Sequence, residues 1–140
     1  MRQAFHEITV STRGKGLYAF TPQVRAWLQA SGIPQGLLTL YIRHTSASLL
    51  IQENYDPTVQ TDLEAFLSRL VPEGDPICAH VLEGADDMPA HVRSALTQTH
   101  LAIPVAEGAP LLGTWQGVSM CSSIGVPRRR EAWVLHLLGE

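Results

Sequence analysis

Apolar and polar side chains alternate along several stretches of the chain, as they do in strands that bury one face. Residues 4–12 are the first predicted strand, and residues 17–20 form a short second strand after a glycine-containing turn. Residues 37–43 carry apolar groups on both faces, which is typical of an interior strand. Further strands are predicted at residues 48–51, 100–105, 111–112, 118–124 and 131–138.

Three other stretches have the period of an amphipathic helix. The first two begin at Thr21 and Asp56, each a capping residue placed before a proline that fits the first helical turn. Gly32 is expected to end the first helix. The third helix is predicted at about residues 88–98, with Asp87 as its N-cap. The apolar stripe of the second helix consists of Val59, Leu63, Phe66, Leu67 and Leu70.

The order of these elements predicts the fold class. Strands come first, helices lie mostly in the middle, and a run of strands ends the chain. This order favours an α+β fold of two packed, mostly antiparallel β-sheets with about three helices to one side, and disfavours a regular βαβ chain. The 140 residues are expected to form a single domain.

Composition and charge narrow the range of partners. A formal net charge of −3 provides no overall basic field, so a nucleic-acid partner is not expected. The basic run at residues 128–130 is interpreted as a solvated turn between two strands rather than as an anion site. No apolar run approaches the ~20 residues of a membrane span, so we expect no membrane partner and a cytoplasmic location.

Cys78 and Cys121 lack a Cys-x-x-Cys spacing and are expected to be free thiols, with Cys121 buried in a strand.

Two short stretches hold most of the candidate chemistry. Residues 83–91 (EGADDMPAH) place two carboxylates and an imidazole around a helix start, and residues 44–47 (HTSA) are polar within apolar sequence. Buried polar groups cost about 1–3 kcal/mol when unpaired, so the second stretch is either a bonded network or a ligand surface. We expect both stretches to meet in one pocket.

Asp87 and His91 are four residues apart and would share one helix face. A carboxylate beside an imidazole raises its basicity and fixes its tautomer, which suits acid–base work or metal binding. A helix cap beside a surface histidine explains the spacing equally well. A metal site formed by His44, His80 and His91 has suitable ligands, although no close His-x-His spacing supports it.

Other polar residues have a functional and a structural interpretation. Asp56 at a helix start, with Asp62 beyond it, could hold a metal ion that binds phosphates, or could simply cap the helix and lie in solvent. Trp115 and Gln116, between two glycines, could wall a pocket for an aromatic ligand, or the tryptophan could belong to the core at a β-bulge.

Several motifs together resemble the YjbQ family, whose members are described as secondary thiamine-phosphate synthase enzymes. The motifs are residues 44–49 (HTSASL), 53–54 (EN), 56–59 (DPTV), Asp62, 83–91 (EGADDMPAH) and 113–117 (GTWQG). The resemblance covers nearly the whole chain and implies a two-sheet α+β fold and a homotrimer. It also implies coupling of hydroxymethylpyrimidine diphosphate to thiazole phosphate with release of pyrophosphate.

The resemblance assigns roles to particular residues. Catalytic roles are expected for His44, His91 and Asp62. Substrate binding is expected for Thr45, Ser46, Asn54, Trp115 and Gln116. From the ligand chemistry of the side chains, rather than from the resemblance, a divalent ion, Mg²⁺ or Zn²⁺, is expected at His44, His80, His91 and Asp56. The partner is expected to be a small phosphorylated metabolite. The alternatives are a metal-dependent hydrolase with a His/Asp pocket and a non-catalytic binder of a small anionic metabolite.

Overall fold

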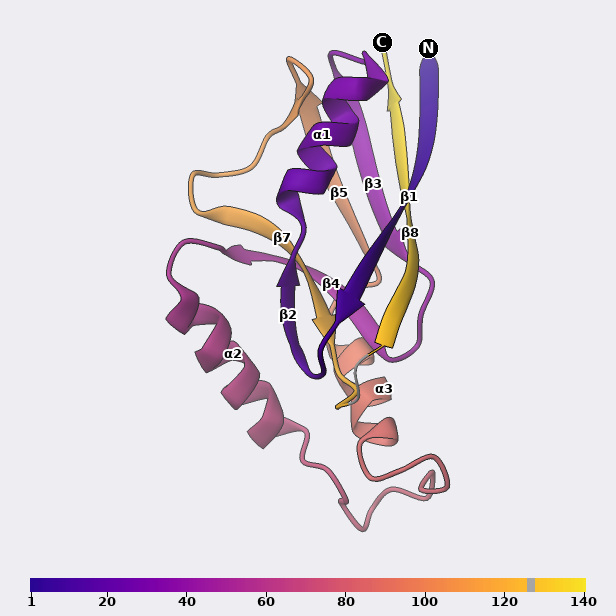
Figure 1. The fold of residues 1–140 in the computed structure, drawn as a ribbon, viewed down its shortest axis with the longest axis vertical. Helices are drawn as coiled ribbons and strands as arrows, with labels where there is room; N and C mark the ends of the chain where they lie inside the picture. The colour runs from indigo at the N-terminus through magenta and orange to yellow at the C-terminus, as the bar shows by residue number, and fades with distance from the viewer. Residues whose placement is uncertain (126–127) are drawn as a thin grey trace.

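The computed structural model of the chain describes residues 1–125 and 128–140, and these form three helices and eight strands (Figure 1). In chain order the elements are β1 (Arg2–Thr12), β2 (Gly16–Ala19), α1 (Thr21–Ser31), β3 (Gly36–Ile42), β4 (Ala47–Glu53), α2 (Pro57–Leu70), α3 (Asp87–Leu96), β5 (His100–Ala106), β6 (Ala109–Pro110), β7 (Gln116–Ser122) and β8 (Arg128–Gly139).

The strands build two sheets, and every pairing among the described residues is antiparallel. One sheet has the order β1-β8-β3-β5-β6, and the other has the order β2-β7-β4. The prediction of two antiparallel sheets with three helices is therefore confirmed. The interior position predicted for β3 is also confirmed, because β3 lies between β8 and β5.

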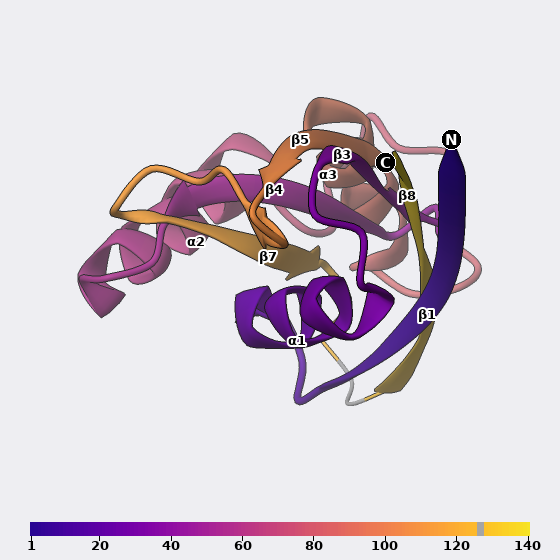
Figure 2. The same ribbon diagram turned by 90° about the horizontal axis from the view of Figure 1, so that it is seen from above.

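The core lies between the two sheets, with α1 closing one side (Figure 2). Alternate residues of β3 show which face is used, since Leu38 and Leu40 are fully buried whereas Leu37 and Tyr41 are exposed. From the three-stranded sheet, Leu49 joins the same core cluster. The second face of β3 is apolar in sequence but stays uncovered in one copy of the chain.

The two proline-led helix starts differ in detail. Asp56 caps α2 as predicted, because its carboxylate accepts from the Thr58 N–H at 2.9 Å. The N-cap of α1 is Phe20 instead of the predicted Thr21. The Thr21 hydroxyl accepts from the Val118 N–H at 2.9 Å, and so ties α1 to β7. Gly32 ends α1 as predicted, in a left-handed conformation with φ of 65°.

Three further expectations were wrong. Residues 128–130 are not a turn, because they begin β8 and pair with residues 10–12 of β1. The strand predicted at residues 111–112 is absent from the described chain, where β6 ends at Pro110. Asp86, not Asp87, occupies the N-cap position of α3. Residues 126–127, which precede the basic run, lie outside the described residues.

The helix α2 stands apart from the core. It is described over its whole length and has no buried residue, although its sequence carries an apolar stripe. Phe66 and Leu70 of that stripe are exposed. The longest described helix is α2 with 14 residues, and no described helix has the length and apolar character needed to cross a membrane.

A buried ion pair joins α2 to α3. Arg93 is 2% exposed and donates to Glu64 Oε1 at 2.8 Å and to Ser68 Oγ at 2.9 Å. The second carboxylate oxygen of Glu64 is buried and has no hydrogen-bond partner among the described residues. The pair therefore fixes the helix that carries His91, at the cost of one unsatisfied oxygen.

We expect Arg93→Ala to lower the free energy of unfolding by about 3 kcal/mol, the lower end for a broken buried pair, since Glu64 is 24% exposed. The double variant Arg93→Met, Glu64→Leu should be more stable than Arg93→Ala, because no charge is left unpaired. Urea unfolding followed by circular dichroism measures both. Equal losses in the two variants would contradict the cost assigned to the unpaired Glu64 charge.

Candidate functional site

The two polar stretches meet where the β3–β4 connection lies against α3. Nδ1 of His91 is 2.9 Å from the backbone oxygen of Thr45 and 3.4 Å from the hydroxyl of Ser46. One turn further along α3, the Ser94 hydroxyl donates to the Ala47 carbonyl at 3.2 Å. These contacts bring residues 44–47 and 83–91 against each other, as predicted, but the two concavities described below are each lined by only one of the two stretches.

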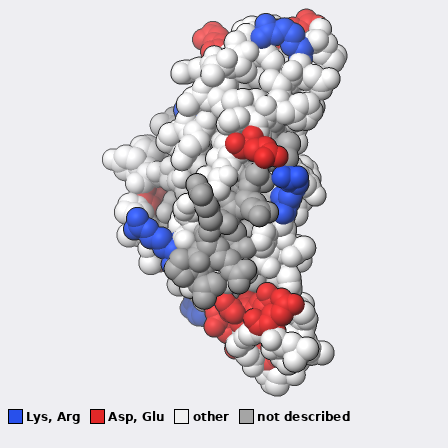
Figure 3. Space-filling model, turned by 45° about the vertical axis from the view of Figure 1, so that its right-hand side comes forward, with Lys and Arg blue, Asp and Glu red and all other residues white. Residues whose placement is uncertain are grey.

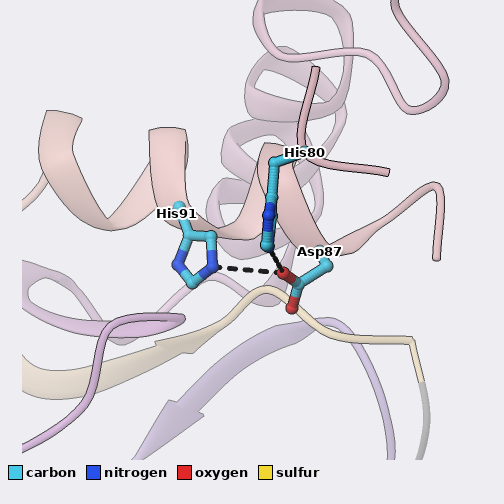
Figure 4. Close-up of side chains that lie close together, drawn as sticks. All are labelled: His80, Asp87 and His91. Atoms are coloured by element: carbon cyan, nitrogen blue, oxygen red, sulfur yellow. Dashed lines mark hydrogen bonds and ion pairs between the residues drawn. The ribbon is translucent and has the colours of Figure 1, made fainter. Parts of the chain in front are cut away.

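One carboxylate oxygen of Asp87 contacts two imidazoles (Figure 4). Its Oδ2 is 2.9 Å from Nε2 of His80 and 3.1 Å from Nε2 of His91, and the two rings lie 5.7 Å apart. Asp87 and His91 come from the first turns of α3, whereas His80 comes from the loop between α2 and α3. The side chains of Asp87, His91 and His80 are 13%, 31% and 45% exposed, so the cluster runs from the interior outward.

The hydrogen bonds restrict the protonation of His91. The Thr45 carbonyl only accepts, so Nδ1 of His91 carries the hydrogen in that contact. Nε2 then faces Asp87 either with a second N–H, as an imidazolium, or with a lone pair directed toward a bound cation. The cluster therefore suits proton transfer or metal binding, which are the two chemistries expected from the sequence.

Neighbouring contacts hold the loops on either side of this cluster. Asp86 Oδ2 accepts from the Gly125 N–H at 3.1 Å, which joins the segment after β7 to the start of α3. Lys15 forms an ion pair with Glu73 of the α2–α3 loop. The pKa of Lys15 is lowered from its ordinary value, first by burial and then by the charge of Arg93.

A pocket of about 220 Å³ opens beside His80. It lies within the α2–α3 loop and the start of α3, and Asp75, Cys78, His80 and Met88 are among its lining residues. Leu82 of the same loop is exposed. The size of the pocket suits a small metabolite or one part of a larger one.

His44 lines a different concavity. This is an open hollow of about 650 Å³, which includes Tyr41, Arg43 and Thr45 in its lining. Nδ1 of His44 accepts from the Ser46 N–H at 2.9 Å, so the other ring nitrogen carries the hydrogen in the neutral ring. His44 is therefore next in sequence to Thr45 and Ser46, which contact His91, but its own side chain lines another surface.

The remaining predicted residues lie at the far end of β4. Asn54 donates its backbone N–H to the Trp115 carbonyl at 2.8 Å, and Gln116 Oε1 accepts from the Gly113 N–H at 2.7 Å. Along the seven residues of β4, about 20 Å separates this end from residues 44–47. One copy of the chain thus does not bring Trp115 and Gln116 together with His91.

Trp115 is 54% exposed and contacts the ring of Tyr55 edge-on, with 4.6 Å between ring centroids. The alternative of a core tryptophan is therefore wrong. Asp56 is occupied in capping α2, and Asp62 is exposed on the same helix.

The metal ligands expected from the sequence are only partly grouped. Within the described residues, His80, Asp87 and His91 bring their ligand atoms within 4.8 Å of one another. His44 and Asp56 do not belong to that group. The i, i+4 spacing of Asp87 and His91 pointed to two of the three residues of the cluster, but the loop that delivers His80 has no comparable sequence signal.

These features define an α+β protein of two antiparallel sheets whose polar site lies between a strand connection and a helix start. The sequence profile described as UPF0047 protein YjbQ-like matches residues 6–140. The chain belongs to this family.

Sequence relatives agree with this assignment. The chain is 48% identical over 139 residues to UPF0047 protein sll1880 of Synechocystis, covering 99% of this chain and 94% of that protein. It is 42% identical over 114 residues to UPF0047 protein YjbQ of Escherichia coli O157:H7, covering 79% and 80% of the two chains.

Solved structures share the fold. The conserved hypothetical protein TT1486 from Thermus thermophilus is 38% identical, with a TM-score of 0.82 over 92% of this chain and 97% of that one. A YbjQ-like protein of unknown function from Sulfolobus solfataricus superposes with a TM-score of 0.89 over 99% of each chain, at 24% identity.

We expect the two free thiols to differ in reactivity. Cys78 is half-buried and lines the pocket, whereas Cys121 is buried in β7, as predicted. Burial raises the pKa of the Cys121 thiol, and this outweighs its contact with the Ser123 hydroxyl at 3.8 Å. Because the thiolate is the reactive form, iodoacetamide at pH 8 should label Cys78 and spare Cys121 until the protein unfolds. Peptide mass spectrometry reads both sites, and equal labelling of the native protein would contradict the expectation.

Proposed function

We propose that the protein is an enzyme that acts on a small phosphorylated metabolite, with the reaction type of a thiamine-phosphate synthase. The observation that carries this proposal is the pair of imidazoles on one Asp87 oxygen beside a pocket of about 220 Å³. The reaction itself is suggested by the resemblance to the YjbQ family.

In this reaction the bond between the pyrimidine methylene carbon and the diphosphate oxygen breaks. The electron pair leaves with pyrophosphate, and the thiazole nitrogen forms the new bond to carbon. The protein must therefore stabilise the negative charge that develops on the leaving group. Positive charge on protonated His80 and His91 supplies that stabilisation in the proposal, and Asp87 orients both rings.

The surroundings make this charge balance demanding. Asp and Glu side chains gather at the end of the molecule that carries the α2–α3 loop (Figure 3). Glu73, Asp75 and Glu83 belong to that loop, and Lys15 is already paired with Glu73. A bare diphosphate would be repelled here, so the proposed substrate enters with a counter-cation or against protonated imidazoles.

A homotrimer and a cytoplasmic location are part of the same proposal. The exposed apolar stripe of α2 and the exposed outer face of β3 support contacts between copies. The separation of Trp115 and Gln116 from His91 supports a pocket in which a neighbouring subunit supplies the aromatic wall.

The substitution pair Phe66→Glu, Leu70→Glu is expected to reduce the mass measured by light scattering from three chains to one. A mass of three chains in that variant would remove the role of α2 in assembly.

A second candidate is a metal-dependent hydrolase that uses the same His/Asp pocket. It is favoured by the ligand character of two imidazoles and one carboxylate in the cluster. It differs from the first candidate in its product, because it would release phosphate or pyrophosphate without forming a bond to the thiazole.

The experiment supplies both precursors to the purified protein and measures thiamine phosphate, pyrophosphate and phosphate by chromatography. We expect thiamine phosphate, and a loss of roughly 100-fold or more in rate for His91→Ala, because a group that transfers or donates a proton typically contributes that much. His100→Ala is the matched control, because His100 is an exposed histidine on β5. The activity of this variant should equal that of the unmodified protein.

Each alternative gives a different result. Pyrophosphate or phosphate released from the diphosphate alone identifies the hydrolase. Ligand recovered unchanged after a thermal-shift response identifies a binder. Full activity in a folded His91→Ala variant would refute the assignment of the site.

A further inference from the structure

We propose that His80, Asp87 and His91 form a binding site for one divalent transition-metal ion of the zinc class, with a coordination position left open to an exogenous ligand. This ligand set differs from the one expected from the sequence, which included His44 and Asp56 and omitted Asp87. The inference does not depend on thiamine-phosphate synthesis.

The spacing of the ligand atoms fits such an ion. Zinc binds imidazole nitrogen at about 2.0–2.1 Å, which places neighbouring ligand atoms of a tetrahedral site about 3.3 Å apart. The two nitrogens lie 2.9 and 3.1 Å from Asp87 Oδ2, and all three ligand atoms are within 4.8 Å of one another. Small adjustments of the rings would therefore admit the ion between them.

The hydrogen bonding of His91 also favours a cation. Nδ1 donates to the Thr45 carbonyl, so a neutral ring turns the lone pair of Nε2 toward a carboxylate oxygen. Two facing lone pairs repel each other unless a proton or a metal ion lies between them. A ring nitrogen bonded to a backbone carbonyl, with the other directed at the ion, is the arrangement found for histidine ligands in metal sites.

The donor set decides which ions are accepted. Two imidazoles and a carboxylate suit Zn²⁺, Co²⁺, Mn²⁺ or Fe²⁺, whereas Mg²⁺ and Ca²⁺ prefer oxygen ligands. The carboxylates of the surrounding loop increase the local attraction for any cation without distinguishing among them. Selectivity for transition metals would therefore come from His80 and His91.

The site has the character of a reactive centre. Three protein ligands leave a position for water or substrate, whereas structural zinc sites are closed by four protein ligands. His80 lines the pocket of about 220 Å³, so a small oxyanion bound there would approach the ion from that side. The loop position of His80 and its 45% exposure are consistent with exchange of the ion with solvent.

The test uses the full chain without a histidine tag, from which metal has been removed with EDTA. Zn²⁺ binding is measured by calorimetric titration, and Co²⁺ binding is measured by visible absorption spectroscopy. We expect one ion per chain, a Co²⁺ spectrum of four or five coordination, and no competition from millimolar Mg²⁺. His80→Ala, His91→Ala and Asp87→Asn should each weaken binding by 10-fold or more. His100→Ala should bind as the unmodified protein does.

Folding is monitored by circular dichroism of each metal-free variant. His91→Gln replaces His91→Ala where the alanine variant does not fold, since it keeps a donor for the Thr45 carbonyl. The proposal would be overturned if Zn²⁺ did not bind at 1 mM, if the three cluster variants bound it as tightly as the unmodified protein, or if Mg²⁺ displaced it. If the protein binds metal but forms no thiamine phosphate, the proposed function fails and the metal site is supported. If the protein binds no metal and still forms thiamine phosphate in EDTA, the metal site fails and the proposed function is supported.

Discussion

The imidazole of His91 is held between a backbone carbonyl and a carboxylate, and the surrounding structure keeps all three groups in place. The Thr45 oxygen is available because β3 ends at Ile42 and β4 begins at Ala47, so the connection leaves it outside the strand ladders. The bond from Ser94 to the Ala47 carbonyl holds α3 against that connection, and the ion pair of Arg93 with Glu64 holds α3 against α2. The tautomer of His91 is thus set by the meeting of a strand end and a helix.

The length of β4 imposes a second constraint. A strand of seven residues holds its two ends about 20 Å apart, and the polar groups of this chain are concentrated at both ends. One end has the imidazoles and the acidic loop, and the other has Trp115, Gln116 and Asn54. No rearrangement of side chains closes that distance. A ligand that needs both sets of groups therefore requires a second copy of the chain, and the uncovered faces of α2 and β3 make such an assembly physically reasonable.

Much of the fold could be predicted because each element has a local cause. Alternation identified the main strands, Asp56 capped α2, and Gly32 ended α1 through its left-handed conformation. The failures share a tertiary cause. The hydroxyl of Thr21 bonds to a distant strand instead of capping its own helix, and residues 128–130 extend β8 because β1 offers a partner along its full length. Two of the three cluster residues, Asp87 and His91, could be paired from their spacing, whereas the position of His80 depends on a loop whose path no periodicity encodes.

Asp87 does not cap α3, and its carboxylate gives the site its negative charge instead. A capping carboxylate would accept backbone N–H groups, but at the first position of α3 the side chain of Asp87 is directed to the imidazoles instead. The partial positive charge of the helix start still favours a carboxylate there. That carboxylate faces two ring nitrogens whose lone pairs need either protons or a metal ion. Because metal binding requires neutral imidazoles, protons and metal compete for the same three atoms.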